Sequence, residues 1–162
     1  MKTLFIMRHA KSSWENAGSS DFDRPLNERG LKAAPMMGKV MKKNKFQLDL
    51  ILSSPAKRAE QTAGLVREAT GIESEINFDE RIYEASPARL LEVVAEQNDN
   101  VDSILLVGHN PGLEGLVRFL TGETHQLTTA NLAVVDLQSN KWNELSSSSG
   151  NLRILIRPKD LQ

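Results

Sequence analysis

The apolar residues of the chain form two kinds of pattern, and these alternate along the sequence. Short runs of consecutive apolar residues, such as 4–7 and 104–107, are typical of strands buried on both faces. Longer stretches repeat apolar residues every three or four positions, which is typical of helices with one buried face. Strands are therefore predicted at 3–7, 48–52, 75–78 and 103–107, and helices at 27–44, at 55–70, from 86 and from 110.

The last quarter of the chain has a different pattern. Three strand-like segments, 132–137, 141–145 and 152–156, are separated by Ser139-Asn140 and by the serine-rich stretch 146–150. Turn residues between such segments predict a hairpin or meander, here at an edge of the sheet. Only one strand follows the serine run, so we interpret it as a loop and not as a linker between domains.

Strands that alternate with helices favour an α/β fold. We expect a three-layer α/β/α sandwich with a mostly parallel sheet and an antiparallel edge. With 162 residues, the chain is expected to form one domain over residues 1–162.

Composition excludes several classes of function. The formal net charge of −1 gives no electrostatic basis for binding nucleic acid or an anionic membrane. No segment approaches the ~20 apolar residues of a membrane span, and the run 4–7 is too short for the core of a signal peptide. The chain has no cysteine, which excludes disulfides and thiolate chemistry. We therefore expect a cytoplasmic protein that binds neither nucleic acid nor membrane.

Polar residues collect where the predicted strands end. In a parallel sheet these ends lie along one edge, where ligands bind. The first strand is followed by Arg8-His9, the second by Ser53-Ser54-Pro55 with Lys57 and Arg58 close behind, and the strand 103–107 by Gly108-His109-Asn110. Two arginines, a lysine and two of the three histidines are thus expected on one side of the sheet.

This set of side chains indicates a phosphate site. Arginine matches phosphate oxygens in bidentate fashion, and helix N-termini add backbone donors. A cation in the first turn of a helix opposes the helix dipole, so Arg58 is better explained by a bound anion than by helix stability. The chain has no glycine-rich nucleotide loop, so direct attack on phosphorus by a side chain is favoured. The candidate nucleophiles are His9, His109, a serine or an aspartate.

A metal site is the alternative for the two histidines. His9 and His109 could bind a metal ion together with Asp21 or Asp23. That hypothesis explains neither arginine, because a cation beside a divalent metal ion repels it.

Three other residues are interpreted more simply. Lys57 is expected to be a solvated helix residue, and His125 a surface residue in a polar loop. Trp14 is expected either to line the mouth of the site or to cover the core.

Three segments together resemble the histidine phosphatase superfamily, which has the phosphoglycerate-mutase-like fold. They are RHAKSSW after the first strand, SSPAKRAEQTA after the second, and VGHNPG after the strand at 103–107. The resemblance extends from residue 2 to about residue 137. In its short length and in the segments DRPLNERG and LTTANLAV, the chain resembles the small phosphohistidine phosphatases of the SixA type.

The resemblance implies a role for each matching residue. His9 corresponds to the histidine that is transiently phosphorylated, and Arg8, Arg58 and His109 to the groups that hold the phosphoryl oxygens. Glu84 lies at a suitable place for the carboxylate that serves as proton donor and then as base. The chain has Ala10 where the family most often has glycine, and it lacks the long helical insertion of the mutases, which argues against a mutase.

The resemblance implies a metal-independent phosphatase that needs no cofactor and forms a phosphohistidine intermediate. The preferred substrate is phosphohistidine on a signalling protein. A small phosphate ester is the alternative substrate. A non-catalytic module that binds phosphorylated partners is the rival function.

Overall fold

The described strands form a single six-stranded sheet in the computed structural model, which describes residues 1–14 and 20–161. Their order across the sheet is β3-β2-β4-β1-β5-β6. The strands β1 to β4 pair in parallel, whereas β5 is antiparallel to β1 and to β6. The predicted parallel sheet with an antiparallel edge is therefore confirmed. The strands are β1 (Lys2–Arg8), β2 (Leu50–Ser53), β3 (Ile76–Phe78), β4 (Ser103–Gly108), β5 (Leu132–Leu137) and β6 (Gly150–Ile156).

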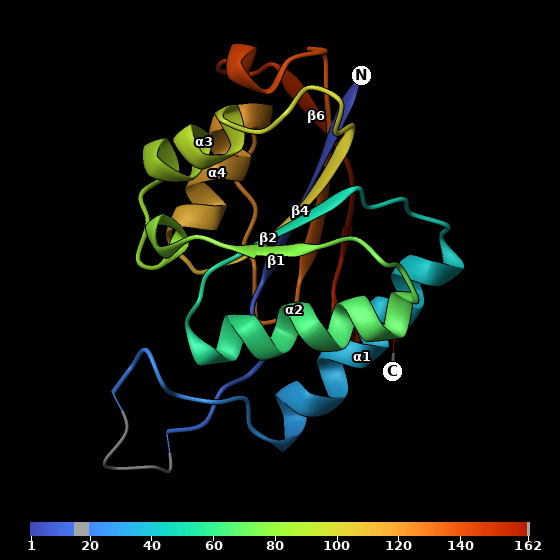
Figure 1. Cartoon of the computed structure of the whole chain (residues 1–162), viewed down its shortest axis with the longest axis vertical. Coiled ribbons are helices and arrows are strands. Elements are labelled where there is room, and N and C mark those ends of the chain that lie inside the picture. The colour runs from blue at the N-terminus through green and yellow to red at the C-terminus, as the bar shows by residue number, and fades with distance from the viewer. Residues whose placement is uncertain (15–19, 162) are drawn as a thin grey trace.

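Helices cover both faces of the sheet (Figure 1). One face packs against α1 (Glu28–Lys43) and α2 (Lys57–Thr70), and the other against α3 (Pro87–Ala95) and α4 (Gly112–Thr121). This is the predicted three-layer sandwich. None of the described helices combines the length and the apolar character needed to cross a lipid bilayer.

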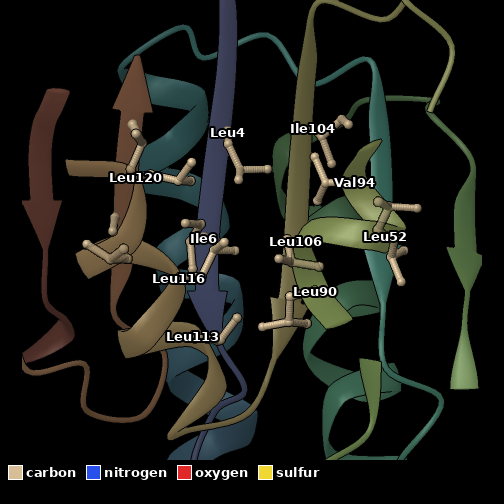
Figure 2. Close-up of a cluster of buried hydrophobic side chains, with 14 of the residues drawn as sticks. Leu4, Ile6, Leu52, Leu90, Val94, Ile104, Leu106, Leu113, Leu116 and Leu120 are labelled. Carbon is tan, nitrogen blue, oxygen red and sulfur yellow. The ribbon is translucent and has the colours of Figure 1, made fainter. Parts of the chain in front are cut away.

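Successive residues of each buried strand serve opposite faces of the sheet, as the two-residue period of a strand requires. Leu4 and Ile6 of β1 pack with the α3 and α4 side chains, whereas Phe5 and Met7 pack with α1 and α2. Figure 2 shows the first of these clusters, in which α4 lies over β1 and α3 lies near β2 and β4. Because helices cover both faces, the middle residues of the central strands β1 and β4 are buried and apolar. The polar groups of the candidate site therefore lie at the strand ends.

One local prediction is wrong. The segment 141–145 is not a strand but contains a 3₁₀ turn at Trp142–Glu144. Trp142 is fully buried, its backbone N–H donates to Asp99 (3.0 Å) and its indole N–H donates to the Val101 carbonyl (2.8 Å), so the segment is bonded to the 99–101 loop. In α1 the buried face follows positions 30, 34, 37, 38 and 41, so Leu31 is 46 % exposed.

The connections after β1 and β4 define where a ligand can bind. These two strands are neighbours, with Arg8 paired to Gly108 at their carboxyl ends. The chain leaves β1 toward α1 on one face and leaves β4 toward α4 on the other. Adjacent strands that connect to opposite faces leave a crevice between their exits, which is where open α/β sheets bind ligands.

Candidate active site

The turn after β1 is held by backbone hydrogen bonds from three directions. The His9 N–H donates to the Gly108 carbonyl (3.1 Å), and the Ala10 N–H donates to Oγ1 of Thr62 in α2 (2.9 Å). The Ala130 N–H donates to the carbonyls of Arg8 and His9 (3.0 and 3.1 Å). The backbone that carries Arg8 and His9 is therefore fixed between β4, α2 and the 130 loop.

His9 is buried and neutral. Its Nδ1 lies 2.7 Å from the Ala10 carbonyl oxygen, and a carbonyl can only accept, so Nδ1 carries the proton. Burial lowers the pKa of His9 to about 3, more strongly than the bond to Ala10 opposes, and His109 with the Arg58 and Arg8 charges lowers it further. A neutral imidazole with Nδ1–H has its lone pair on Nε2, the form that can attack phosphorus.

Arg58 lies directly beside that lone pair. It is the second residue of α2 and is 5 % exposed, and its Nε donates toward Nε2 of His9 over 3.4 Å. Its two terminal nitrogens donate to Asp21, one to the backbone carbonyl (2.7 Å) and one to the carboxylate (3.0 Å). The position of Arg58 in the first turn of a helix predicts an anion beside it, and in this structure that anion is the carboxylate of Asp21.

Asp21 accepts from two further side chains. The Tyr83 hydroxyl donates to Oδ2 over 2.6 Å, and Arg24 donates to Oδ1 over 3.0 Å. The Tyr83 hydrogen bond, with support from Arg24 and Arg58, holds the pKa of the Asp21 carboxyl well below its usual range. Asp21 therefore binds cationic side chains. Within residues 1–14 and 20–161, no group of three or more His, Asp or Glu side chains is arranged so that it could hold a metal ion.

His109 follows β4 and faces the same crevice. Its ring centroid lies 5.1 Å from that of His9, and its Nε2 lies 2.8 Å from Oγ of Ser54. Ser54 also accepts from the Ala56 N–H (3.2 Å), so its own proton is free to donate to His109. Burial first, and the charge of Arg58 second, lower the pKa of His109 to about 4. His109 is therefore neutral at physiological pH.

Two buried nitrogens of this cluster lack a hydrogen-bond partner among the described residues. They are Nε of Arg8 and Nδ1 of His109. Arg8 is otherwise held by a bond from Nη1 to the Leu127 carbonyl (3.2 Å). Burial lowers the Arg8 pKa and Glu114 opposes this, but a guanidinium stays charged. Each unpaired buried group costs about 1–3 kcal/mol, which an oxygen-rich ligand would recover.

Comparison with known proteins identifies the family of this chain. The family model of the histidine phosphatase superfamily (branch 1) matches residues 4–92. The chain belongs to the histidine phosphatase superfamily. The expected family and phosphatase activity are therefore confirmed, and the phosphoglycerate-mutase-like fold is confirmed by the structural neighbours.

Three relatives illustrate the range of the similarity. Rv1276c, an uncharacterized protein of Mycobacterium tuberculosis, is 35 % identical over 84 % of this chain and 80 % of its own length. Phosphohistidine phosphatase SixA of Escherichia coli is 30 % identical over 85 % of this chain and 86 % of its own. A structure of the protein histidine phosphatase SixA complexed with tungstate is 28 % identical, has a TM-score of 0.82 and covers 99 % of both chains.

Glu84 is the remaining predicted residue of this phosphatase. Its side chain is exposed, and it lines a cavity of about 480 Å³ together with Tyr83 and Arg89. Its backbone adopts a left-handed conformation (φ 52°), which is unfavourable for a residue with a Cβ. Its charge also raises the pKa of Tyr83, after the larger effects of the Asp21 hydrogen bond and burial.

The simpler interpretations of the outer residues are settled by their contacts. Lys57 is exposed and pairs with Glu60 (3.2 Å), and His125 is partly exposed and pairs with Glu123 (2.8 Å). Trp14 is 76 % exposed and stacks on the Arg24 guanidinium, 3.6 Å from the ring centroid. It therefore does not cover the core.

Sequence reasoning missed three residues of the candidate site. Ser54 was noted only as part of a strand exit, Asp21 only as a metal ligand, and Tyr83 not at all. Ser54 could have been found, because it directly follows a buried strand, β2, which pairs with β4, the strand that ends before His109. Asp21 and Tyr83 meet through loops 62 positions apart, and no periodic pattern signals such a contact.

The lowered pKa values of His9 and His109 predict how the stability of this phosphatase depends on pH. Both are neutral in the folded protein at pH 5, whereas in the unfolded chain they bind protons below about pH 6.5. The free energy of unfolding should be unaffected by these groups above that pH and should fall between pH 6.5 and 5, by at most about 1.4 kcal/mol per pH unit for each. Urea unfolding at pH 7.5, 6.5, 5.8 and 5.0 measures this slope.

Variants of the two buried histidines assign the slope to them. His9→Gln and His109→Gln should each flatten it. A wild-type free energy of unfolding that stays constant between pH 6.5 and 5 would contradict the buried neutral histidines.

Proposed function

We propose that this phosphatase removes phosphate from phosphohistidine on a signalling protein, through a phosphohistidine intermediate on His9. The observation that carries this proposal is the buried neutral His9, with its Nε2 lone pair among the donors of Arg8, Arg58 and His109. This arrangement provides a nucleophile and a clamp for phosphoryl oxygens in one crevice.

The reaction has two steps in this proposal. Nε2 of His9 attacks phosphorus in line, a nitrogen–phosphorus bond forms, and the bond to the leaving group breaks. Water then attacks the phosphorylated His9, which releases inorganic phosphate and restores the neutral imidazole. Arg8, Arg58 and His109 stabilise the charge on the equatorial oxygens in both steps. Each proposed contact to phosphate is an arginine or histidine donor, so the mechanism needs no metal ion or other cofactor.

The substrate class follows from two kinds of support. The SixA relatives named above are phosphohistidine phosphatases by name, and the chain resembles them over nearly its whole length. Imidazole is also a good leaving group, so a site whose candidate proton donor, Glu84, is exposed to solvent suits phosphohistidine. A phosphorylated protein in the cytoplasm is the partner that this proposal implies.

Glu84 favours a second candidate, a small phosphate ester. Alkyl oxygen is a poor leaving group and needs a proton. Glu84 lines a cavity together with Tyr83, whose ring contacts that of His109. In this version Glu84 donates a proton to the ester oxygen and then removes one from the attacking water. The exposed cavity it lines would receive the rest of the ester.

Covalent labelling tests the nucleophile. Brief incubation with a ³²P-labelled phosphohistidine protein, followed by denaturation, should leave acid-labile and base-stable phosphate on the enzyme. His9→Ala should abolish the label and lower turnover by at least about a thousandfold, because no other group replaces the nucleophile. His125→Ala, a histidine outside the site, should label normally. Label that persists in the His9→Ala protein or maps to a serine would sink the assignment.

The variant Glu84→Gln separates the two substrate classes. If Glu84 protonates the leaving group, the variant should lose on the order of a hundredfold in turnover of an alkyl phosphate and only a few-fold with phosphohistidine. Turnover of both substrates by wild type and variant measures this ratio. Glu80→Gln, which removes a charge from the same cavity, is the control. Equal losses on both substrates would exclude Glu84 as the leaving-group acid.

A further inference from the structure

One carboxylate connects the phosphate clamp to a loop and to an aromatic ring on the far side of the crevice. Asp21 receives the two terminal nitrogens of Arg58, the Tyr83 hydroxyl and a nitrogen of Arg24. Tyr83 in turn places its ring edge-on to His109, with centroids 5.6 Å apart. The proposed mechanism assigns no task to Asp21 or to Tyr83.

We propose that Asp21 and Tyr83 are a positioning pair that sets the guanidinium of Arg58 against His9. The inference rests on the proposed phosphate site and adds to it two residues that do not touch the substrate. Without these two residues, the long side chain of Arg58 would lose the hydrogen bonds that hold its terminal nitrogens and could adopt other rotamers.

The contacts explain how the pair sets the guanidinium. Asp21 takes one hydrogen from each terminal nitrogen of Arg58, on its backbone carbonyl and on its carboxylate. This bidentate grip leaves Nε directed at His9, where a phosphoryl oxygen would replace the long 3.4 Å contact. These two hydrogen bonds fix the orientation of the guanidinium plane. Arg58 is therefore already ordered before the substrate binds.

Tyr83 fixes the carboxylate itself. Its hydroxyl bond to Oδ2 is short (2.6 Å), and its ring contacts Phe22 edge-on with centroids 5.2 Å apart. The Asp21 loop is thereby joined to the segment that follows β3. A displacement of Tyr83 would move the Asp21 carboxylate and, with it, Arg58.

The charge states of the pair exclude a proton-transfer role. Asp21 is ionised throughout the physiological range, because its three donors hold its pKa well below the usual value. The hydrogen bond to Asp21, helped by burial, raises the pKa of Tyr83 to about 12, so its proton stays in place. Neither group exchanges a proton at neutral pH, and their effect is therefore on geometry.

Kinetics of six variants test the pair. Asp21→Asn and Tyr83→Phe are each made alone and together with Arg58→Ala, and Arg58→Ala is also made alone. Asp23→Asn, two residues from Asp21, is the control of equal charge change. The Asp23 carboxylate accepts from Ser20 at an exposed position. The measurements are kcat and KM with an aryl phosphate, and the inhibition constant of orthovanadate, which mimics the five-coordinate phosphorus.

The pair should act only through Arg58. In the wild-type background, Asp21→Asn should lower kcat/KM by on the order of tenfold to a hundredfold and Tyr83→Phe by about tenfold, with vanadate binding weakened in parallel. In the Arg58→Ala background, both changes should alter kcat/KM less than about twofold. Partial unfolding would lower kcat and leave KM and the vanadate constant unchanged, so parallel losses identify positioning.

Two results would overturn the inference, and they differ from each other. Effects of Asp21→Asn and Tyr83→Phe that multiply with Arg58→Ala would show that the pair acts independently, and the phosphate site would still stand. Full activity of Arg58→Ala itself would remove Arg58 from the site, and with it both the proposed mechanism and the positioning pair.

Discussion

The hydrogen bond from Nδ1 of His9 to the Ala10 carbonyl governs the chemistry of the whole site. It fixes which nitrogen carries the proton and leaves the lone pair on Nε2, beside Arg58. Burial is the main reason that the ring stays neutral, and the charges of Arg58 and Arg8 add to this effect. Burial and the neighbouring cations therefore keep His9 in the neutral form, whose lone pair can attack phosphorus.

The fold makes this arrangement possible by bringing three strand ends together. Arg8 and Gly108 are paired at the ends of β1 and β4, and Ser53 of β2 pairs with Val107. The chain then departs to opposite faces after β1 and β4, which opens the crevice between them. The sheet, covered on both faces, holds Arg8 and His9 at its edge, while loops and a helix start provide Asp21, Tyr83 and Arg58.

The residues at the strand ends could be predicted from the sequence, whereas the contacts made by the loops could not. Continuous apolar runs identify buried strands, and the residues directly after them must lie at one edge, so Arg8, His9 and His109 could be placed in advance. Arg58 was placed because it opens the helix after such a strand. The histidine phosphatase motifs then gave these positions their expected roles.

Contacts between loops could not be predicted in this way. Tyr83 reaches Asp21 across 62 positions, and nothing in the spacing of either segment indicates the pairing. The segment 141–145 was mistaken for a strand, because a single buried tryptophan imitates the alternation of a half-buried strand. Where one anchor residue or one long-range hydrogen bond decides the local structure, periodicity carries no signal.

The neutral Nδ1–H form of His9 is the central claim, and nitrogen NMR tests it most directly. Long-range ¹H–¹⁵N spectra of the ¹⁵N-histidine-labelled protein distinguish protonated from unprotonated ring nitrogens, with His9→Gln for assignment. At pH 7 the account predicts an N–H shift for Nδ1 of His9 and a lone-pair shift for Nε2, both constant down to pH 5. An imidazolium at pH 7, or a proton on Nε2, would contradict it.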